Sequence, residues 1–121
     1  MNICTLEISI DGYELIDIVA LDSNQLIGVC KLWLNDREIL SECHLEGLFV
    51  APSYRGRGYG KLIIDKVIQL SKDNGKDTIV LQVHETNSVA RTLYASYGFI
   101  EYSDPDDRGL IDCYLRISEP H

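Results

Sequence analysis

Alternating apolar and polar residues dominate the first fifty positions of the chain. In the segment LEISI (6–10), three apolar residues alternate with two polar ones. A period of two is typical of a β-strand with one buried face, and the Asp11-Gly12 pair that follows is a turn signal. We therefore expect the chain to begin with a strand that turns back at this pair. A short helix at Asp11–Leu15 is the alternative.

Three more strands are expected before Pro52, from β-type runs that read ELIDIVAL, LIGVCKLWL and ECHLEGLFV. Pro52 ends the last of them, since proline cannot donate to a strand ladder. Gly47 lies inside this fourth run. A glycine within a strand often marks a bulge or a close approach of another group to the backbone, so we expect one of these at Gly47.

The apolar period changes after this run. In YGKLIIDKVIQLSK (59–72), apolar residues recur at helical spacing, and Asn74-Gly75 ends the pattern. The next apolar run, TIVLQV (78–83), is typical of a strand buried in the centre of a sheet. This stretch therefore predicts one amphipathic helix followed by one buried strand.

A second helix and two strands are expected in the last third of the chain. The helix runs through SVARTLYASY, with Thr86 or Asn87 as its N-cap and Gly98 after its end. The runs FIEY and LIDCYLRI read as strands around the acidic loop SDPDDRG. The expected order is β-β-β-β-α-β-α-β-β. The predicted fold class is therefore α/β (α+β), a mixed sheet with helices packed on it, formed by residues 1–121 as one domain.

Composition narrows the class of protein. The chain has 121 residues, of which 45% are hydrophobic and 25% charged, the balance of one globular domain. It has no apolar run of the roughly 18 residues that a membrane span needs. Its first residues carry no basic segment typical of a signal peptide. We therefore expect a cytoplasmic protein that does not contact a membrane.

Charge and cysteine content exclude further classes. A formal charge of -8 argues against nucleic acid as a partner, because phosphate backbones bind basic faces. The four cysteines are widely spaced and include no C-x-x-C pair, so we expect neither a disulfide nor a metal site. The cysteines predicted to be buried, reduced thiols are Cys4, Cys30, Cys43 and Cys113.

One short segment differs from this acidic background. VAPSYRGRGYGKLII (50–64) holds three of the eleven basic residues, Arg55, Arg57 and Lys61, between a predicted strand and a predicted helix. Glycines let the backbone approach a ligand, and the first N–H groups of a helix are unpaired at the positive end of its dipole. We interpret the segment as an anion site of the kind that holds a pyrophosphate.

Other phosphate-binding patterns fit this segment less well. A Walker loop requires G-x-x-x-x-G-K-[ST], but Leu62 stands at the Ser/Thr position. A Rossmann fingerprint requires G-x-G-x-x-G, whereas this segment reads G-x-G-x-G. An RNA-binding RGG tail would be repeated, and this run occurs once. The remaining alternative is a plain helix start with a glycine turn and solvated arginines.

At this point the sequence resembles the GNAT acetyltransferases. LEGLFVAPSYRGRGYGKLII is similar to their acetyl-CoA motif, [QR]-x-x-G-x-[GA] after a strand ending V-x-P, and reads Arg55-x-x-Gly58-x-Gly60. NSVARTLYASYGFIEY is similar to a second family segment, N-x-x-A-x-x-L-Y-x-x-x-G-F. The matching residues are Asn87, Ala90, Leu93, Tyr94, Gly98 and Phe99. The resemblance implies a GNAT-like acyl-CoA N-acyltransferase fold with acetyl-CoA as acyl donor and no metal.

The resemblance also implies roles for individual residues. In the family, backbone groups of the strand before the loop pair with the pantetheine arm, the loop holds the pyrophosphate, and an asparagine contacts the arm from the other side. A tyrosine protonates the leaving thiolate, and Tyr94 occupies its position. The implied cofactor-binding residues are Leu48, Phe49, Val50, Arg55, Gly56, Arg57, Gly58, Tyr59, Gly60, Lys61, Asn87 and Tyr94.

The implied reaction is direct attack of a primary amine on the acetyl thioester in a ternary complex. A positioned base must take the proton of the ammonium. Glu46 is the candidate, because spermidine/spermine acetyltransferases, which this chain somewhat resembles, have a glutamate there that serves the acceptor amine. His44, Glu42 and a water chain are alternatives. A strand amide near Phe49 or Val50 could stabilise the oxyanion.

The sequence departs from the family in its first forty residues, which read as β throughout. The two helices that wall the acceptor site in the family are missing from this reading. An open groove suits a protein lysine or N-terminus as well as a polyamine or small amine, and a second subunit could cover it as a homodimer. Trp33 and Tyr54 could line the site. The acidic residues that could steer a cationic acceptor are Asp36, Glu38, Glu42, Asp104, Asp106 and Asp107.

Two other classes of function compete with an N-acetyltransferase. A catalytically silent module could bind acyl-CoA and regulate a partner, which would keep the loop and lose the chemistry. A phosphate- or nucleotide-binding interaction domain is the third, but it gives no reason for the second segment. The presence of both Tyr94 and Glu46 favours the enzyme.

Overall fold

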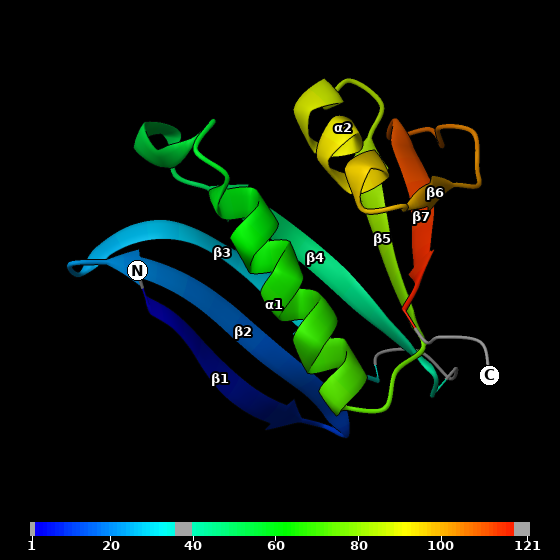
Figure 1. Ribbon diagram of the computed structural model, residues 1–121. Helices are drawn as coiled ribbons and strands as arrows, with labels where there is room; N and C mark the ends of the chain where they lie inside the picture. Colours follow the sequence, from blue (N-terminus) through cyan, green and yellow to red (C-terminus); the bar gives the residue numbers. More distant parts are fainter. Residues whose placement is uncertain (1, 36–39, 118–121) are drawn as a thin grey trace.

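The predicted element order is confirmed by the structure, a computed structural model that describes residues 2–35 and 40–117 (Figure 1). The elements are β1 Asn2–Ile10, β2 Tyr13–Asp22, β3 Gln25–Trp33, β4 Glu42–Val50, the short 3-10 helix η1 Pro52–Tyr54, α1 Tyr59–Asp73, β5 Thr78–His84, α2 Ser88–Ser96, β6 Ile100–Glu101 and β7 Leu110–Arg116.

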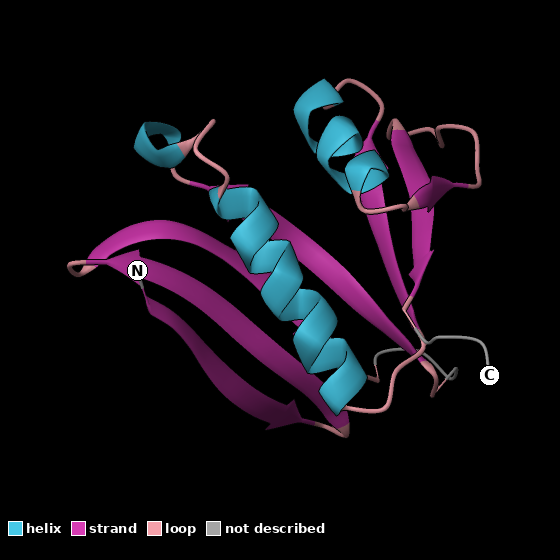
Figure 2. Cartoon of the chain, viewed as in Figure 1, coloured by secondary structure: helices cyan, strands magenta, loops and turns pink. Residues whose placement is uncertain are grey.

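All seven strands form one sheet in the order β1-β2-β3-β4-β5-β7-β6. Neighbouring strands are antiparallel except β4 and β5, which run parallel and pair only between Glu42–His44 and Thr78–Val80. Beyond these residues the two strands diverge, so the sheet has a first arm of β1–β4 and a second arm of β5, β7 and β6. α1 lies over the first arm and α2 over the second, on the same side of the sheet (Figures 1 and 2). The sheet is therefore split along part of its middle.

The core lies between the helices and the sheet, and it is continuous from the residues under α1 to those under α2. Strand alternation points Ile16 and Ile18 to this face, where they are almost fully buried. Helical spacing brings Ile63, Ile64 and Val67 onto them, and none of these three side chains is exposed. The amphipathic pattern of the sequence thus dictates which face of the sheet α1 covers.

The first hairpin turns tightly at Asp11 and Gly12, which both have positive φ, 49° and 83°. Such a two-residue turn matches the twist of antiparallel strands, so the alternative helix at Asp11–Leu15 does not form. β1 is an edge strand, and the predicted burial of Cys4 is wrong because this residue is exposed on it.

The other three cysteines, Cys30, Cys43 and Cys113, are buried as predicted. Within residues 2–35 and 40–117, neither helix is long and apolar enough to cross a membrane. The same residues contain no group of three or more His, Cys, Asp and Glu side chains arranged for a metal ion.

Candidate functional site

A groove of about 700 Å³ opens where β4 and β5 diverge. It lies between the end of β4, the glycine-rich segment with the start of α1, and the start of α2. Its lining residues are Leu48, Phe49, Val50, Tyr54, Arg55, Gly56, Gly58, Tyr59, Gly60, Lys61, Asn87, Val89, Ala90 and Leu93. The structure therefore brings the two sequence segments singled out above to opposite sides of one groove.

A β-bulge at Gly47 helps to split the sheet. Lys31 pairs with Glu46 and Val29 pairs with Phe49, so two residues of β4 stand opposite one residue of β3. Gly47 has φ 67°, a conformation that favours glycine. A bulge bends its strand and increases the local twist, and this one lies just beyond the last β4 residue paired with β5. The bulge predicted at Gly47 is confirmed.

The glycine-rich segment presents backbone N–H groups to the groove. Gly58 is the N-cap of α1 with φ 84°, and no side chain caps the helix. The amides of Tyr59, Gly60 and Lys61, as the first of the helix, have no carbonyl acceptor within it. A Cβ atom at Gly58 would meet nothing within 4 Å, so the positive φ and not a lack of space favours glycine at this position. The local geometry is that of an anion site.

The two arginines of the segment lie in different places. Arg55 lines the groove, donates from Nε to the carbonyl of Val50 at 2.8 Å, and has its guanidinium 5.4 Å from the centre of the Phe49 ring. Arg57 does not line it, and its guanidinium lies 6.0 Å from the centre of the Tyr54 ring. Arg55 therefore contributes charge and shape to the groove, whereas Arg57 packs beside it.

The opposite wall is the first turn and a half of α2. Asn87 caps the helix, with its Oδ1 accepting from the Ala90 amide at 3.1 Å. The side-chain Nδ2 of Asn87 then stays available as a donor at the groove. Val89, Ala90 and Leu93 line the wall beside it, and none of them was predicted as a binding residue. Their helical spacing from the N-cap was the signal that could have identified them.

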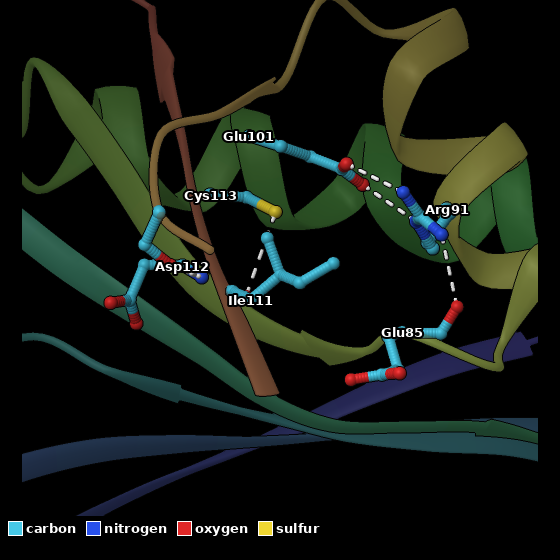
Figure 3. Close-up of polar contacts among 7 residues, drawn as sticks. Glu85, Arg91, Glu101, Ile111, Asp112 and Cys113 are labelled. Atoms are coloured by element: carbon cyan, nitrogen blue, oxygen red, sulfur yellow. Dashed lines mark hydrogen bonds and ion pairs between the residues drawn. The ribbon is translucent and has the colours of Figure 1, made fainter. Parts of the chain in front are cut away.

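An ion pair fixes α2 to the second arm of the sheet (Figure 3). Arg91 donates to both carboxylate oxygens of Glu101 at 2.9 Å and to the carbonyl of Glu85 at 2.9 Å. Hydrogen bonds from Arg91 lower the pKa of Glu101, and those to Glu101 raise the pKa of Arg91. The bidentate geometry sets the rotation of α2, which positions Asn87 and Tyr94.

A second contact joins α2 to α1 across the base of the groove. The Tyr97 hydroxyl donates to Asp65 at 2.7 Å and lies 2.9 Å from the carbonyl oxygen of Lys61. Burial and the hydrogen bond to Asp65 raise the pKa of Tyr97 to about 12. The two helices are thus held together at the positions that flank the groove.

Tyr94 does not line the groove. It is 8% exposed, packs against Phe99 with ring centres 5.4 Å apart, and lines a separate hollow of about 340 Å³ that includes Cys113. Burial raises its pKa to about 12, and the thiols of Cys30 and Cys113 add to the shift. The phenol therefore stays protonated at neutral pH, as a proton donor must.

Glu46 points to the face of β4 that lies away from α1 and does not line the groove, although Phe49 of the same face does. Leu45, its neighbour in the strand, is 3% exposed in the core under α1, so alternation turns Glu46 to the helix-free face. Glu46 is exposed there and stands opposite Lys31 in the sheet. His44 points to the same face, opposite Trp33. A donor in the groove and an acceptor near Glu46 would therefore approach β4 from two sides.

One carboxylate of the acidic loop between β6 and β7, that of Asp106, stabilises the loop itself. Asp106 accepts from the amides of Leu110 and Arg108, at 2.9 and 2.8 Å, and pairs with the Arg108 side chain. These hydrogen bonds lower the pKa of Asp106, and the bond from the Leu110 amide has the largest effect. Of the second acidic cluster, Asp36 and Glu38 lie outside the described residues.

Comparison with known proteins agrees with this geometry. Residues 6–99 match the sequence profile of the Acetyltransferase (GNAT) family. A [Ribosomal protein bS18]-alanine N-acetyltransferase from Haemophilus influenzae is 36% identical over 92 residues, which are 74% of this chain and 58% of that protein. A Thialysine N-epsilon-acetyltransferase from Bos taurus is 40% identical over 55 residues, 46% of this chain and 32% of that protein.

Solved structures share the fold. The PaiA N-acetyltransferase from Thermoplasma acidophilum, in complex with coenzyme A, superposes with a TM-score of 0.74 at 24% identity and covers 84% of this chain and 60% of its own. The ribosomal-protein-S18-alanine N-acetyltransferase from Escherichia coli superposes with a TM-score of 0.73 at 23% identity, covering 93% and 74%. The chain spans 58% of the Haemophilus relative and less of the bovine one.

Proposed function

Because the chain belongs to the Acetyltransferase (GNAT) family, we propose that it transfers an acetyl group from acetyl-CoA to a primary amine. The observation that carries the proposal is the anion site at the start of α1, which opens into a groove at the split between β4 and β5. A pyrophosphate on these amides would direct the rest of the cosubstrate along the groove toward the split.

The residues present fit acetyl-CoA. The amides of Tyr59, Gly60 and Lys61 and the side chain of Arg55 supply donors and charge for the pyrophosphate. Apolar side chains of β4 and α2 line the groove for the pantetheine arm, and Asn87 offers one amide donor to it. A groove of about 700 Å³ is in the range of ligand sites.

The reaction requires one group that takes a proton from the acceptor amine and another that gives a proton to the leaving thiolate. A lysine-like amine has a pKa of about 10.4, so at pH 7 only about one molecule in 2,500 is neutral, a cost of roughly 4–5 kcal/mol. In our proposal Glu46, reached directly or through water, takes that proton on the helix-free face. Tyr94, which does not line the groove, gives its proton directly or through water to the thiolate that leaves when the C–S bond breaks. The second proton that the nitrogen loses as the C–N bond forms returns Tyr94 to its neutral form.

The acceptor is a cationic amine on the helix-free side of β4. The relatives named above are, by their names, an N-acetyltransferase for an alanine of ribosomal protein bS18 and an N-epsilon-acetyltransferase for thialysine, so both protein and small-molecule acceptors occur among similar proteins. We propose a peptide N-terminus or lysine first, and a polyamine second, because the exposed position of Glu46 leaves room for a bulky acceptor.

Calorimetric titration with acetyl-CoA tests the proposal, with dephosphorylated pantetheine and ATP as controls. We expect micromolar binding of acetyl-CoA and much weaker binding of both controls. Equal binding of ATP, or no binding, would contradict it. Thiol release with an alanine-initiated peptide, a lysine peptide and spermidine then identifies the acceptor class. Binding without thiol release for every amine would favour a silent acyl-CoA-binding module.

The role of Glu46 is tested by Glu46→Gln. We expect its rate to fall most below the pKa of the acceptor amine and to approach wild type where the amine is already neutral, since a base is then not needed. The pH–rate profile of each protein, measured with one acceptor, checks this. A profile of the same shape as wild type would show that Glu46 is a bystander.

A further inference from the structure

The face of β1–β4 that points away from α1 carries a large apolar surface. Neither α1 nor α2 lies on it, since both helices pack on the other side of the sheet (Figures 1 and 2). Leu6, Ile10, Tyr13 and Phe49 on this face are 61%, 55%, 47% and 43% exposed. Large apolar patches on a soluble protein usually mark an interaction site.

The strand register arranges this face in rows across the sheet. One row is apolar: Cys4, Val19, Val29 and Phe49. The next row carries charge: Leu6, Asp17, Lys31 and Glu46. The third is largely apolar again: Ile8, Leu15, Trp33 and His44. A charged row thus lies between two apolar rows, with unlike charges on the two central strands.

We propose that a second copy of this chain packs face to face on this surface, with the two-fold axis parallel to the strands and between β2 and β3. Such an axis places each row of one copy over the same row of the other copy, with the residues in the opposite order. Asp17 of each copy then faces Lys31 of the other, and Val19 faces Val29. The two central strands are thus self-complementary, as a two-fold interface requires, while Glu46 at the edge of the row faces Leu6.

Charge complementarity identifies the occupant. Asp17 and Lys31 stand opposite each other in the sheet, and within the described part of the chain neither forms an ion pair. A membrane surface or an acidic partner would leave Asp17 unmatched, and a basic partner would leave Lys31 unmatched. A second copy matches both charges at once, in two equivalent contacts.

The available area is sufficient for a stable dimer. Four strands about 4.8 Å apart, each of nine or ten residues at about 3.3 Å, cover a flat area of about 590 Å². Protruding side chains enlarge this toward the roughly 800 Å² per partner of a standard interface. Face-to-face sheets pack with their strands within about 30° of each other, so the rows stay in contact near the axis.

The proposed dimer would also change the surroundings of Glu46. In the reversed row, Leu6 of the second copy lies over Glu46, and the row with Cys4 lies over Phe49. The second copy would thus cover Glu46 in the dimer, so a bulky acceptor would reach Glu46 only when the two copies separate. The dimer itself does not depend on the proposed activity, so each can fail without the other.

Charge reversal tests the arrangement by sedimentation equilibrium at physiological salt. We expect wild type to be a dimer and Asp17→Lys and Lys31→Glu each to dissociate at least tenfold more readily. A mixture of the two variants should restore a dimer, because both intermolecular contacts then join unlike charges. A cross-strand effect within one chain could not be restored by mixing. A wild-type monomer, or a mixture that stays monomeric, would overturn the proposal.

Leu6→Glu tests the outer part of the charged row, since this exposed residue should tolerate the change within a folded monomer and the new carboxylate would face Glu46 of the second copy. Ile100→Glu is the matched control, because Ile100 is 52% exposed on β6, outside β1–β4. We expect the first variant to be monomeric and the second dimeric, both with wild-type circular dichroism and acetyl-CoA affinity. A dimeric Leu6→Glu protein would overturn the face-to-face geometry.

Discussion

The groove and the surroundings of Tyr94 are built by different means. The groove is open, and its anion site consists of backbone amides arranged by residues with positive φ, such as Gly58. Tyr94 is enclosed by side chains, and burial raises its pKa to about 12. Anion binding by backbone amides should tolerate changes of neighbouring side chains, but it depends on the local φ and ψ. Proton donation by Tyr94 depends instead on one side-chain oxygen. The groove should therefore be sensitive to substitutions that change the backbone conformation, and the Tyr94 region to removal of a single side-chain atom.

The largest expected effect is that of Tyr94→Phe, which removes the phenol oxygen and keeps the ring against Phe99. We expect kcat to fall at least tenfold, a lower bound set below the roughly 10²- to 10⁴-fold that a positioned acid contributes, with acetyl-CoA affinity nearly unchanged. Steady-state kinetics and calorimetry measure the two quantities. Tyr13→Phe, an exposed tyrosine, is the control and should have wild-type kcat. A fully active Tyr94→Phe enzyme would remove Tyr94 from the mechanism.

Gly58→Ala addresses the backbone of the groove. An alanine at φ 84° costs about 1–2 kcal/mol, and relief of that strain would move the amides of the anion site. We expect acetyl-CoA affinity to fall about five- to thirtyfold, the equivalent of that energy. Gly75→Ala is matched, because Gly75 has φ 74° but lies at the far end of α1. It should lower Tm similarly and leave affinity intact. Equal affinities of both variants would contradict the backbone role.

Asn87 caps the backbone of α2 with its Oδ1 and also offers its Nδ2 as a side-chain donor at the groove. Two substitutions separate these roles. Asn87→Asp keeps the Oδ1 cap of Ala90 and replaces the Nδ2 donor by negative charge. We expect unchanged stability and acetyl-CoA affinity lowered severalfold. Asn87→Ala loses the cap as well, so the free energy of unfolding should fall by about 1 kcal/mol. Urea titration and calorimetry distinguish the two. An Asn87→Asp protein with wild-type affinity would show that Asn87 only caps α2.

The smallest expected effect concerns alkaline stability. Burial, with Asp17 as a lesser cause, raises the pKa of Cys30 from 9.0 to about 12. The folded protein then keeps a proton that the unfolded chain releases, so this contribution is complete below pH 9 and is lost as the pH rises toward 12. Cys30→Ser should weaken the fall of unfolding free energy with pH, while Cys4→Ser, at an exposed site, should not. Identical slopes in urea titrations would contradict this.

Sequence patterns predicted the elements well because local periodicity decides them. The hairpin at Asp11, the bulge at Gly47 and the N-cap choice that included Asn87 all follow from short-range chemistry. The buried strand TIVLQV was predicted from its composition, but its parallel pairing with β4 was not predicted.

The arrangement of the candidate site was less predictable, because it depends on contacts between distant segments. Nothing local to Arg57 shows that it packs on Tyr54 while Arg55 lines the groove. The burial of Tyr94 depends on residues from β7 and from the segment after α2. The exposure of Cys4 depends on β1 being an edge strand.

The short pairing between β4 and β5 also has a kinetic consequence. The arm from β1 to α1 is built largely from neighbouring hairpins, and the arm from β5 to β7 closes on itself around α2. Only the residues around Cys43 and Ile79 join the two arms in hydrogen-bonded register within the described chain. If the shared core and the contact of Tyr97 with Asp65 yield first, each arm opens as a separate cooperative unit, which native-state hydrogen exchange would resolve as two sets of amides. A ligand lying in the groove touches both arms, and would merge these sets into one by slowing the opening of either.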